Sequence, residues 1–414
     1  MSRRRVVVTG IGLVTPVGNT TEESWSALVA GTSGAARIQR FDPSNLEVQF
    51  ACEVKGFDPF AWMDRKEAKR MDRFAQYAMA ASAQAVNAAA LTNGFPDRDR
   101  AGVLIGSGIG GIETFVEQVT TFLHKGPNRV SPFFVPMFIA DMAAGLVSMR
   151  WGLTGPNYCT VSACASSAHA IGEAYRLIAY GDAEVMVAGG AEAAITPLAL
   201  AGFGNMKALS VRNDSPATAS RPFDATRDGF VMGDGAGVVI LEDLGHAVRR
   251  GARIICEVSG YGMSADAYHM TQPAPEGRGA QLAMRAALKD AKVSVAEVGY
   301  INAHGTSTPQ GDIAETLAVK AVFGEHARGL VVGSTKSMTG HQLGAAGGVE
   351  LAICALAIER GVIPPTINYT TPDPECDLDC APNRAVQRTV DAAMSNSFGF
   401  GGHNVSVLLK RYAA

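Results

Sequence analysis

The chain has 414 residues, of which 47% are hydrophobic and 18% charged, and its formal net charge is −3. Disordered chains combine low hydrophobicity with high net charge, so the composition excludes them, and the charge balance does not indicate a nucleic-acid-binding protein. The length allows two or three domains, or one large duplicated body with a sizeable core.

Cysteine usage and apolar runs exclude further classes. The seven cysteines are scattered, odd in number and without a CxxC pair, which argues against a disulfide framework. Cys376 and Cys380 come nearest to a metal-binding pair, but no histidine or second pair accompanies them, so we expect no metal. No signal-peptide core follows the basic start of the chain, and no apolar run reaches the ~18 residues of a membrane span. We therefore expect a cytoplasmic protein.

Short strand-like runs alternate with helical patterns along the whole chain. The expected strands are Val6–Thr9, Val103–Ile105, Glu184–Ala188, Val238–Leu241, Ile254–Val258, Tyr300–Ala303, Leu330–Val332 and Val405–Leu409. The expected helices are Arg73–Ala90, Ala165–Tyr180, Gln281–Lys289, Ala314–Phe323 and Ala345–Arg360. This alternation is typical of an α/β fold with mostly parallel strands.

Two features occur twice, in the same order. Arg5–Gly12 (RVVVTGIG) and Arg253–Gly262 (RIICEVSGYG) both read as a strand ending in Gly-x-Gly. The helices Ala165–Gly181 and Ala345–Gly361 are both rich in small residues and end in glycine. Similarity at such a long period indicates a duplicated α/β unit. We therefore divide the chain into an N-terminal half, 1–253, and a C-terminal half, 254–414.

Cys164 is the strongest candidate for a nucleophile. It lies on a turn between a strand-like run and a helix that ends at Gly181. A helix N-terminus lowers the pKa of a thiol and offers backbone N–H groups to an oxyanion. Free cysteines are more often small buried hydrophobic residues, and we expect that of Cys159, Cys256 and Cys354.

Three further polar residues follow predicted strands in the second half. His304 comes directly after one strand, and Lys336 and His341 flank a glycine-bearing loop after the next. Open α/β sheets bind their ligands at the carboxyl ends of strands. A cysteine, two histidines and a lysine without a metal pattern indicate acyl transfer through a thioester, in which imidazoles donate hydrogen bonds to a carbonyl that becomes an enolate. Sequence spacing leaves open whether these residues converge.

Three local patterns have more ordinary interpretations. Asp312 and Glu315 read as an N-cap and its capping-box partner for the following helix. Gly106–Gly111 satisfies GxGxxG, but the acidic residue that a dinucleotide site needs about 20 positions later is missing, so we expect no nucleotide site. A basic cluster near Lys66 and Lys69 fits a solvated helix face better than a docking patch for an acidic partner.

Four segments of the chain resemble the β-ketoacyl-acyl-carrier-protein synthases, which are condensing enzymes of the thiolase-fold superfamily. They are VSACASSAHAIG around Cys164, NAHGTSTPQGD around His304, STKSMTGHQLGAAG around Lys336 and His341, and NSFGFGGHN at Asn396–Asn404. The resemblance extends from Val6 to Leu409. It implies a thiolase-like α/β fold of five layers, αβαβα, built from two related halves and usually present as a homodimer.

The resemblance implies a role for each matched residue of the reaction site. Cys164 corresponds to the acylated nucleophile. His304 and His341 correspond to the pair that supports malonyl decarboxylation and binds the thioester carbonyl. Lys336 corresponds to the lysine that supports their electrostatics, with Glu350 as its acidic neighbour.

Binding residues are implied in the same way. Phe400 corresponds to a gating phenylalanine whose N–H joins that of Cys164 in an oxyanion hole. Thr306 and Thr308 correspond to threonines that hydrogen-bond the pantetheine arm. The residues that would contact the acyl chain are Ile109, Phe203, Phe398 and, across the dimer, Phe133. The residues that would dock the carrier protein, and that now favour a docking patch, are Arg65, Lys66, Lys69, Arg70 and Lys207.

Two positions bear on the subtype. Type I enzymes tend to have a small residue where this chain has Ile109, which favours type II and medium or long acyl chains. His403 stands beside the gating loop where many members have threonine, and this departure leaves gate behaviour and chain-length preference open.

The implied activity is that of a 3-oxoacyl-acyl-carrier-protein synthase, which joins malonyl-acyl-carrier protein to a cysteine-bound acyl chain with loss of carbon dioxide. The implied partners are acyl carrier protein and a second copy of the chain, without nucleic acid or membrane. No cofactor is implied, because the carrier protein brings the phosphopantetheine.

Four alternatives remain at this point. A polyketide chain-extending ketosynthase shares these motifs and is the hardest to separate. A non-catalytic partner subunit usually lacks the nucleophile, whereas Cys164 is present. A degradative thiolase needs a second active-site cysteine in the C-terminal half, and a Cys-His hydrolase needs neither Lys336 nor a second histidine.

Overall fold

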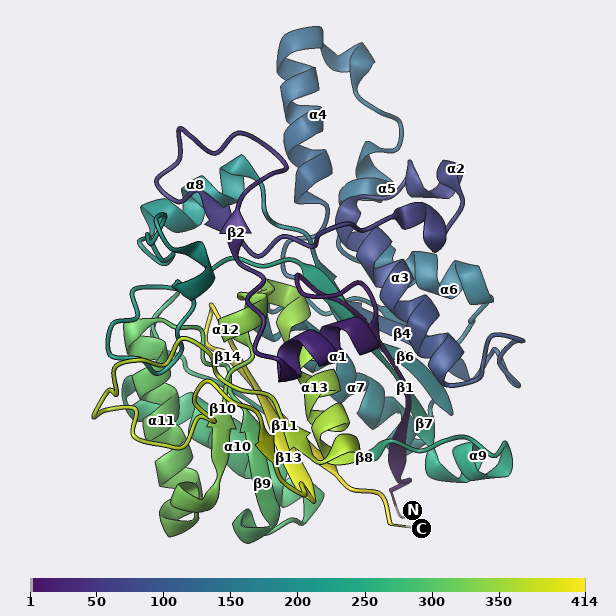
Figure 1. Ribbon diagram of the computed structural model, residues 1–414. Helices are drawn as coiled ribbons and strands as arrows, with labels where there is room; N and C mark the ends of the chain where they lie inside the picture. The colour runs from purple at the N-terminus through teal and green to yellow at the C-terminus, as the bar shows by residue number, and fades with distance from the viewer. Residues whose placement is uncertain (1–2, 414) are drawn as a thin grey trace.

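One large sheet dominates the structure, a computed structural model that describes residues 3–413 (Figure 1). Residues 1, 2 and 414, which the predicted halves include, lie outside the described residues. The strands of this sheet are β1 (Val6–Val14), β4 (Ala101–Gly106), β5 (Asn157–Tyr158), β6 (Val185–Glu192), β7 (Gly235–Asp243), β8 (Cys256–Ala265), β9 (Val298–Asn302), β10 (Val331–Gly333), β13 (Ala392–Gly399) and β14 (His403–Lys410). Within the described residues their order is β10-β9-β13-β14-β8-β1-β7-β6-β4-β5.

The strand order repeats between the two halves of the chain. When the five strands of each half are counted in chain order, both halves run 3-2-4-5-1 from the outer edge of the sheet to its centre. At the centre β1 and β8 pair antiparallel, with Val6 opposite Val258. The repeat supports our proposed division at 253/254, which falls between α9 (Leu244–Arg249) and β8.

The expectation of a mostly parallel sheet is wrong. Of the nine neighbouring pairs in the described part of the sheet, five are antiparallel and four parallel. β13 and β14 are joined by a tight turn in which Gly399 pairs with His403, and a tight turn reverses the chain. The alternation of strand-like and helical patterns indicated parallel strands joined by helices. It gave no sign of strands that are joined directly by a turn.

Helices form three further layers. α3 (Arg73–Ala88) and α6 (Met142–Trp151) cover the outer face of the first half-sheet, and α10 (Arg278–Ala291) and α11 (Pro309–Phe323) lie on the outer side of the second. α7 (Ser166–Tyr180) and α13 (Ala346–Arg360) lie between the half-sheets (Figure 1). The five-layer αβαβα arrangement is thus confirmed.

The remaining elements are short or peripheral. They are the helices α1 (Thr21–Val29), α2 (Arg65–Ala68), α4 (Ile112–Lys125), α5 (Phe134–Phe138), α8 (Pro197–Asn205) and α12 (Lys336–Thr339), and the strands β2 (Ala36–Arg37), β3 (Phe50–Ala51), β11 (Val362–Ile363) and β12 (Val386–Gln387). Between residues 3 and 413, the helices are too short or too polar for any of them to cross a membrane.

The sequence predicted that the two Gly-x-Gly pairs stand at strand ends. In the structure they lie inside β1 and β8. Gly12 faces α3, and a Cβ there would lie 1.8 Å from the carbonyl oxygen of Ala81. Gly262 faces α10 in the same way, and a Cβ there would lie 2.1 Å from the carbonyl oxygen of Ala283. Glycine therefore lets a helix backbone lie directly on a strand in both halves.

Replacing Gly12 by alanine should strongly destabilise the fold, because the new methyl group would overlap the backbone of α3. We expect Gly12→Ala to lower the free energy of unfolding by about 3 kcal/mol, measured by urea denaturation. Gly299→Ala is the matched control, since this strand glycine has its nearest neighbouring atoms at 3.9 Å. Equal losses in the two variants would contradict this account of the packing.

Candidate active site

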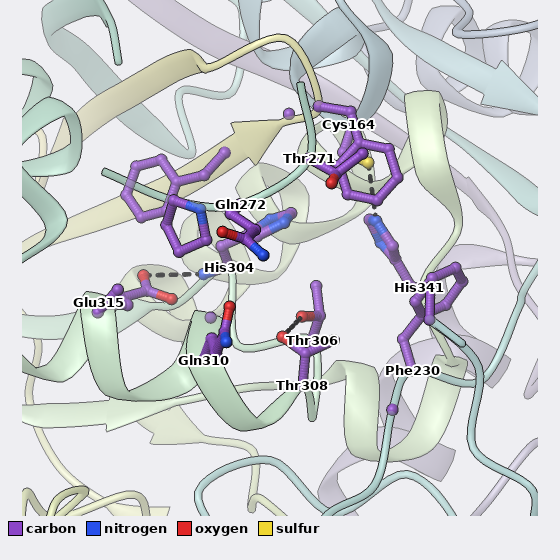
Figure 2. A pocket seen from close by; sticks show the side chains of 18 of the residues that line it. Cys164, Phe230, Thr271, Gln272, His304, Thr306, Thr308, Gln310, Glu315 and His341 are labelled. Carbon is purple, nitrogen blue, oxygen red and sulfur yellow. Dashed lines mark hydrogen bonds between the residues drawn. The ribbon is translucent and has the colours of Figure 1, made fainter. Parts of the chain in front are cut away.

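Turns from both halves of the chain meet at one cavity, whose volume is about 440 Å³. Cys164 is the middle residue of a 3-10 turn, Ala163–Ala165, that leads into α7. His304 directly follows β9, and His341 follows α12. Figure 2 shows the side chains of Cys164, His304 and His341 directed into this cavity. The tertiary structure therefore brings the predicted thiol and both predicted imidazoles together.

Cys164 and His341 are in direct contact. The Nε2 atom of His341 lies 3.0 Å from Sγ of Cys164, and both side chains are buried. The His304 ring stands perpendicular to the His341 ring, with 5.2 Å between their centroids. A ligand atom bound beside the sulfur would thus face both imidazoles.

A buried ion pair supports the histidines from behind the cavity wall. Lys336 and Glu350 are both almost completely buried, and the Lys336 ammonium donates to the Glu350 carboxylate. Burial, and after it the charge of Lys336, holds the pKa values of His304 and His341 well below 6.5. Both imidazoles are therefore neutral at physiological pH.

The acidic thiol expected of Cys164 is not found. Burial raises the pKa of Cys164 to about 12, and the charge of Lys336 and the N–H of Phe400 offset this only in part. Desolvation of a charge outweighs the favourable field of a helix N-terminus at a site this deep. The resting thiol is protonated, and Nε2 of a neutral His341 is the adjacent acceptor for its proton.

Two backbone N–H groups point at the sulfur. Those of Phe400 and of Cys164 itself donate toward Sγ. The turn between β13 and β14 comes so close that a Cβ on Gly399 would lie 3.2 Å from the backbone nitrogen of Cys164. Phe400 also lines the cavity, and its ring centroid lies 6.4 Å from that of Phe203. An oxygen bound to the carbon attached to Sγ would meet preorganised donors here.

Polar side chains line the opposite part of the cavity. The Oγ1 atoms of Thr306 and Thr308 lie 3.1 Å apart, and both residues border the cavity. Thr271, Gln272 and Gln310 face them (Figure 2). The sequence analysis missed all three: Gln310 stands within the segment NAHGTSTPQGD but was not singled out, and Thr271 and Gln272 belong to none of the quoted motifs.

The predicted capping box at Asp312 and Glu315 is wrong. α11 already begins at Pro309, so both acids lie inside the helix and are buried. The Glu315 carboxylate accepts hydrogen bonds from the N–H groups of His304 and Gly305, at 3.0 and 2.8 Å. Asp312 accepts from Ser307 N–H, at 3.2 Å. The two acids hold the loop that carries His304 and the threonines.

The expected acyl-chain residues are only partly gathered at the cavity. Phe203 and Phe398 line it. Ile109 does not line it, but it packs against the apolar cluster that contains Cys164 and Leu343. Phe133 is 38% exposed and packs under the guanidinium of Arg70, which lies 4.6 Å from its ring centroid.

The expected docking residues lie on the surface. Arg65, Lys66, Lys69 and Arg70 are exposed on or beside α2. Lys207 borders the cavity but is paired with the carboxylate of Glu47, at 2.8 Å. Among residues 3–413 no cluster of three or more His, Cys, Asp or Glu side chains could hold a metal ion.

Family models match both halves of the chain. The N-terminal domain model of the β-ketoacyl synthases matches residues 3–247, and the C-terminal domain model matches residues 255–370. Among curated proteins, the "3-oxoacyl-[acyl-carrier-protein] synthase 2" of Synechocystis sp. is 54% identical over 412 residues, covering 100% of this chain and 99% of the relative. The protein of the same name from Vibrio harveyi is 52% identical over 414 residues, covering 100% of both chains.

Solved structures agree. A β-ketoacyl synthase from Burkholderia phymatum superposes with a TM-score of 0.91 at 39% identity, covering 99% of this chain and 100% of that one. A type II PKS ketosynthase, solved with its acyl-carrier protein and bound to a hexaketide, gives 0.92 at 35% identity, covering 100% of both chains. With family models over both halves and full-length relatives above half identity, the chain belongs to the β-ketoacyl synthase family.

Proposed function

We propose that the protein is a 3-oxoacyl-acyl-carrier-protein synthase that lengthens fatty acyl chains by two carbons. The observation that carries this proposal is the contact of Cys164 Sγ with His341 Nε2, with His304 beside them, at the end of a cavity lined by Thr306 and Thr308. The curated relatives at 52–54% identity bear the name of this activity.

The first step is transfer of the acyl group to Cys164. The sulfur attacks the thioester carbonyl of the acyl-carrier protein while Nε2 of His341 takes the thiol proton. The N–H groups of Cys164 and Phe400 stabilise the tetrahedral oxyanion. Its collapse breaks the bond to the pantetheine sulfur, which receives the proton from His341 and leaves as a thiol.

The second step forms the new carbon–carbon bond. Malonyl-acyl-carrier protein binds with its thioester oxygen between His304 and His341. His341, which acted as an acceptor at Nε2 in the first step, is now the tautomer with its proton on Nε2, so both imidazoles donate hydrogen bonds as the malonyl carboxylate leaves as carbon dioxide and the enolate forms. The enolate carbon attacks the acyl carbonyl on Cys164 and expels the thiolate. The thiolate recovers a proton, and the 3-oxoacyl product leaves on the carrier.

The chemistry of these steps needs no metal or organic cofactor, because loss of carbon dioxide generates the carbanion. Thr306 and Thr308 are the groups that would hydrogen-bond the pantetheine arm of the carrier. The charge of Lys336 adds to the effect of burial, which is the main reason that the pKa values of the two imidazoles are low. Glu350 balances that charge within the protein interior.

The partners we propose are acyl carrier protein and a second copy of the chain. The exposed cations of Arg65, Lys66, Lys69 and Arg70 form a patch suited to an acidic carrier. Self-association is supported by β5, which lies at the outer edge of the sheet. Tyr158 of this strand is 40% exposed, and Val161, three residues further along the chain, is 63% exposed. Unpaired apolar edges of this kind are usually covered by another chain.

A polyketide-type ketosynthase is the second candidate, favoured by structural neighbours of that kind. Those neighbours are 35–37% identical to this chain, whereas the curated relatives named 3-oxoacyl-[acyl-carrier-protein] synthase 2 are 52–54% identical. The presence of Cys164 argues against a non-catalytic partner subunit. Products carrying several keto groups from repeated malonyl additions would favour the polyketide alternative.

A condensation assay tests the proposal directly. Purified protein with malonyl-acyl-carrier protein and saturated acyl donors should yield 3-oxoacyl products two carbons longer, detected by mass spectrometry.

Cys164→Ala should abolish the acyl-enzyme and the product yet retain malonyl decarboxylation. His304→Ala and His341→Ala should each lower decarboxylation about 10²- to 10³-fold, because each removes a donor to the oxyanion. The assigned roles are wrong if both histidine variants decarboxylate at the rate of the unaltered protein.

The pH dependence of acyl transfer should reveal the effect of Lys336. Its charge lowers the pKa of His341, so Lys336→Met should raise that pKa and protonate the imidazole at higher pH. The acylation rate of the variant should then fall more steeply as the pH drops from 7.5 to about 5.5 than that of the unaltered protein, in which burial and the Lys336 charge together lower the pKa of His341.

Mass-spectrometric quantification of acylated Cys164 over this pH range provides the measurement. Lys320→Met is the control, because Lys320 lies on the surface and pairs with Asp377. Parallel profiles for Lys336→Met and the unaltered protein would disprove the electrostatic role of Lys336.

A further inference from the structure

The turn that carries Cys164 has a counterpart in the second half of the chain. The turn Ala163–Ala165 precedes the 15-residue helix α7, and the turn Leu343–Ala345 precedes the 15-residue helix α13. Both turns begin with a non-glycine residue in the left-handed region, Ala163 at φ 50° and Leu343 at φ 46°. Gly344 therefore occupies the position equivalent to Cys164, and its N–H is equivalent to the donor in the oxyanion hole.

In the second half this donor is occupied by a side chain of the protein. Glu192, the last residue of β6, is fully buried, and its Oε2 accepts from the N–H groups of Gly344 and Gly108, at 3.0 and 2.7 Å. Its Oε1 accepts from Ser107 Oγ and the N–H of Ile109, at 2.8 and 3.2 Å. Four donors satisfy the carboxylate, so the duplicated hole is filled where that of Cys164 is open.

The segments joined by Glu192 carry the apolar side chains around the sulfur of Cys164. Ile109 and Leu343 belong to the cluster that contains Cys164, and so does Ile195, three residues after Glu192. The turn Leu343–Ala345 touches the loop that follows β4 directly, since a Cβ on Gly344 would lie 2.2 Å from the nitrogen of Gly108 and 2.5 Å from Glu192 Oε2. One carboxylate thus holds two loops from different halves in fixed register beside the nucleophile.

We propose that Glu192 is a positioning residue that fixes the wall formed by Ile109 and Leu343, and thereby sets the length of the apolar chain that fits on Cys164. That the natural chain is an acyl group rests on the proposed function. The geometric argument applies to any alkyl group attached to the sulfur. Without the carboxylate, three buried N–H groups lose their acceptor, and the loops shift until other acceptors or water satisfy them.

The variant Glu192→Gln tests this proposal. The amide keeps the size of the side chain but replaces one of the two acceptor oxygens by an NH2 donor, so at least one of the N–H groups loses its acceptor. The probes are N-alkylmaleimides of graded length, from N-ethyl to N-dodecyl, which alkylate Cys164 without a carrier protein and are followed by intact mass. We expect the ratio of long-chain to short-chain rate constants to change roughly tenfold or more, while the N-ethyl rate changes less than about threefold.

A second variant and a control separate this role from general stability. Ser107→Ala removes one donor to Glu192 and should change the same ratio in the same direction by a smaller factor, which keeps the test available if Glu192→Gln does not fold. Glu242 is equally buried but pairs with Thr9, His246 and Arg250, and it does not line the cavity. Glu242→Gln should lower stability and leave the ratio unchanged.

The possible outcomes decide the proposal. An unchanged ratio in Glu192→Gln, or in Ser107→Ala where only that variant folds, overturns it. A uniform change at every chain length also overturns it, because this would indicate a purely structural role. The maleimide assay is independent of condensation, so an unaltered protein that forms no 3-oxoacyl product counts against the proposed function alone.

Discussion

The site depends on the direct contact of α13 with the half-sheet of the other half of the chain. A Cβ on Gly237 of β7 would lie 2.3 Å from the backbone nitrogen of Val349, and a Cβ on Gly348 would lie 2.4 Å from the carbonyl oxygen of Gly237. Side chains at these positions would push the two halves apart. The turn before α7 carries Cys164, and the turn before α13 comes shortly after His341. This backbone contact therefore fixes the two turns relative to each other, with 3.0 Å between the thiol sulfur and the imidazole Nε2.

The same close packing sets the electrostatics of the site. Burial keeps both imidazoles neutral and the thiol protonated, so the activation that we propose for Cys164 is proton transfer to its neighbour rather than an intrinsically low pKa. The buried charge of Lys336 is tolerated because Glu350 pairs with it. Neutral donors and a protonated nucleophile suit a reaction in which negative charge develops on an oxyanion and an enolate as the bonds change.

Duplication of the fold provides two equivalent turns, and the protein uses them differently. In the first half the middle residue is Cys164, the proposed nucleophile, and its N–H and that of Phe400 point at the sulfur, where an oxyanion would form. In the second half the middle residue is Gly344, and Glu192 fills the corresponding hole. We therefore propose that one copy of the turn reacts and that the other holds the apolar side chains around the sulfur.

The sequence by itself determined the α/β class, the duplication and the chemically active residues, because motifs around Cys164, His304, Lys336 and His341 are local and highly specific. It also located the five helices that it predicted, which correspond to α3, α7, α10, α11 and α13, with ends that differ by at most five residues. β13 was missed, because its small and polar residues, such as Ser395 and Asn396, are buried by neighbours distant in sequence rather than marked by an apolar pattern. Only the tertiary structure decided the mixed strand directions, the support of the His304 loop by Glu315, the raised pKa of Cys164 and the bridging role of Glu192. Each of these depends on burial or on contacts between remote segments, and such contacts leave no local signal along the chain.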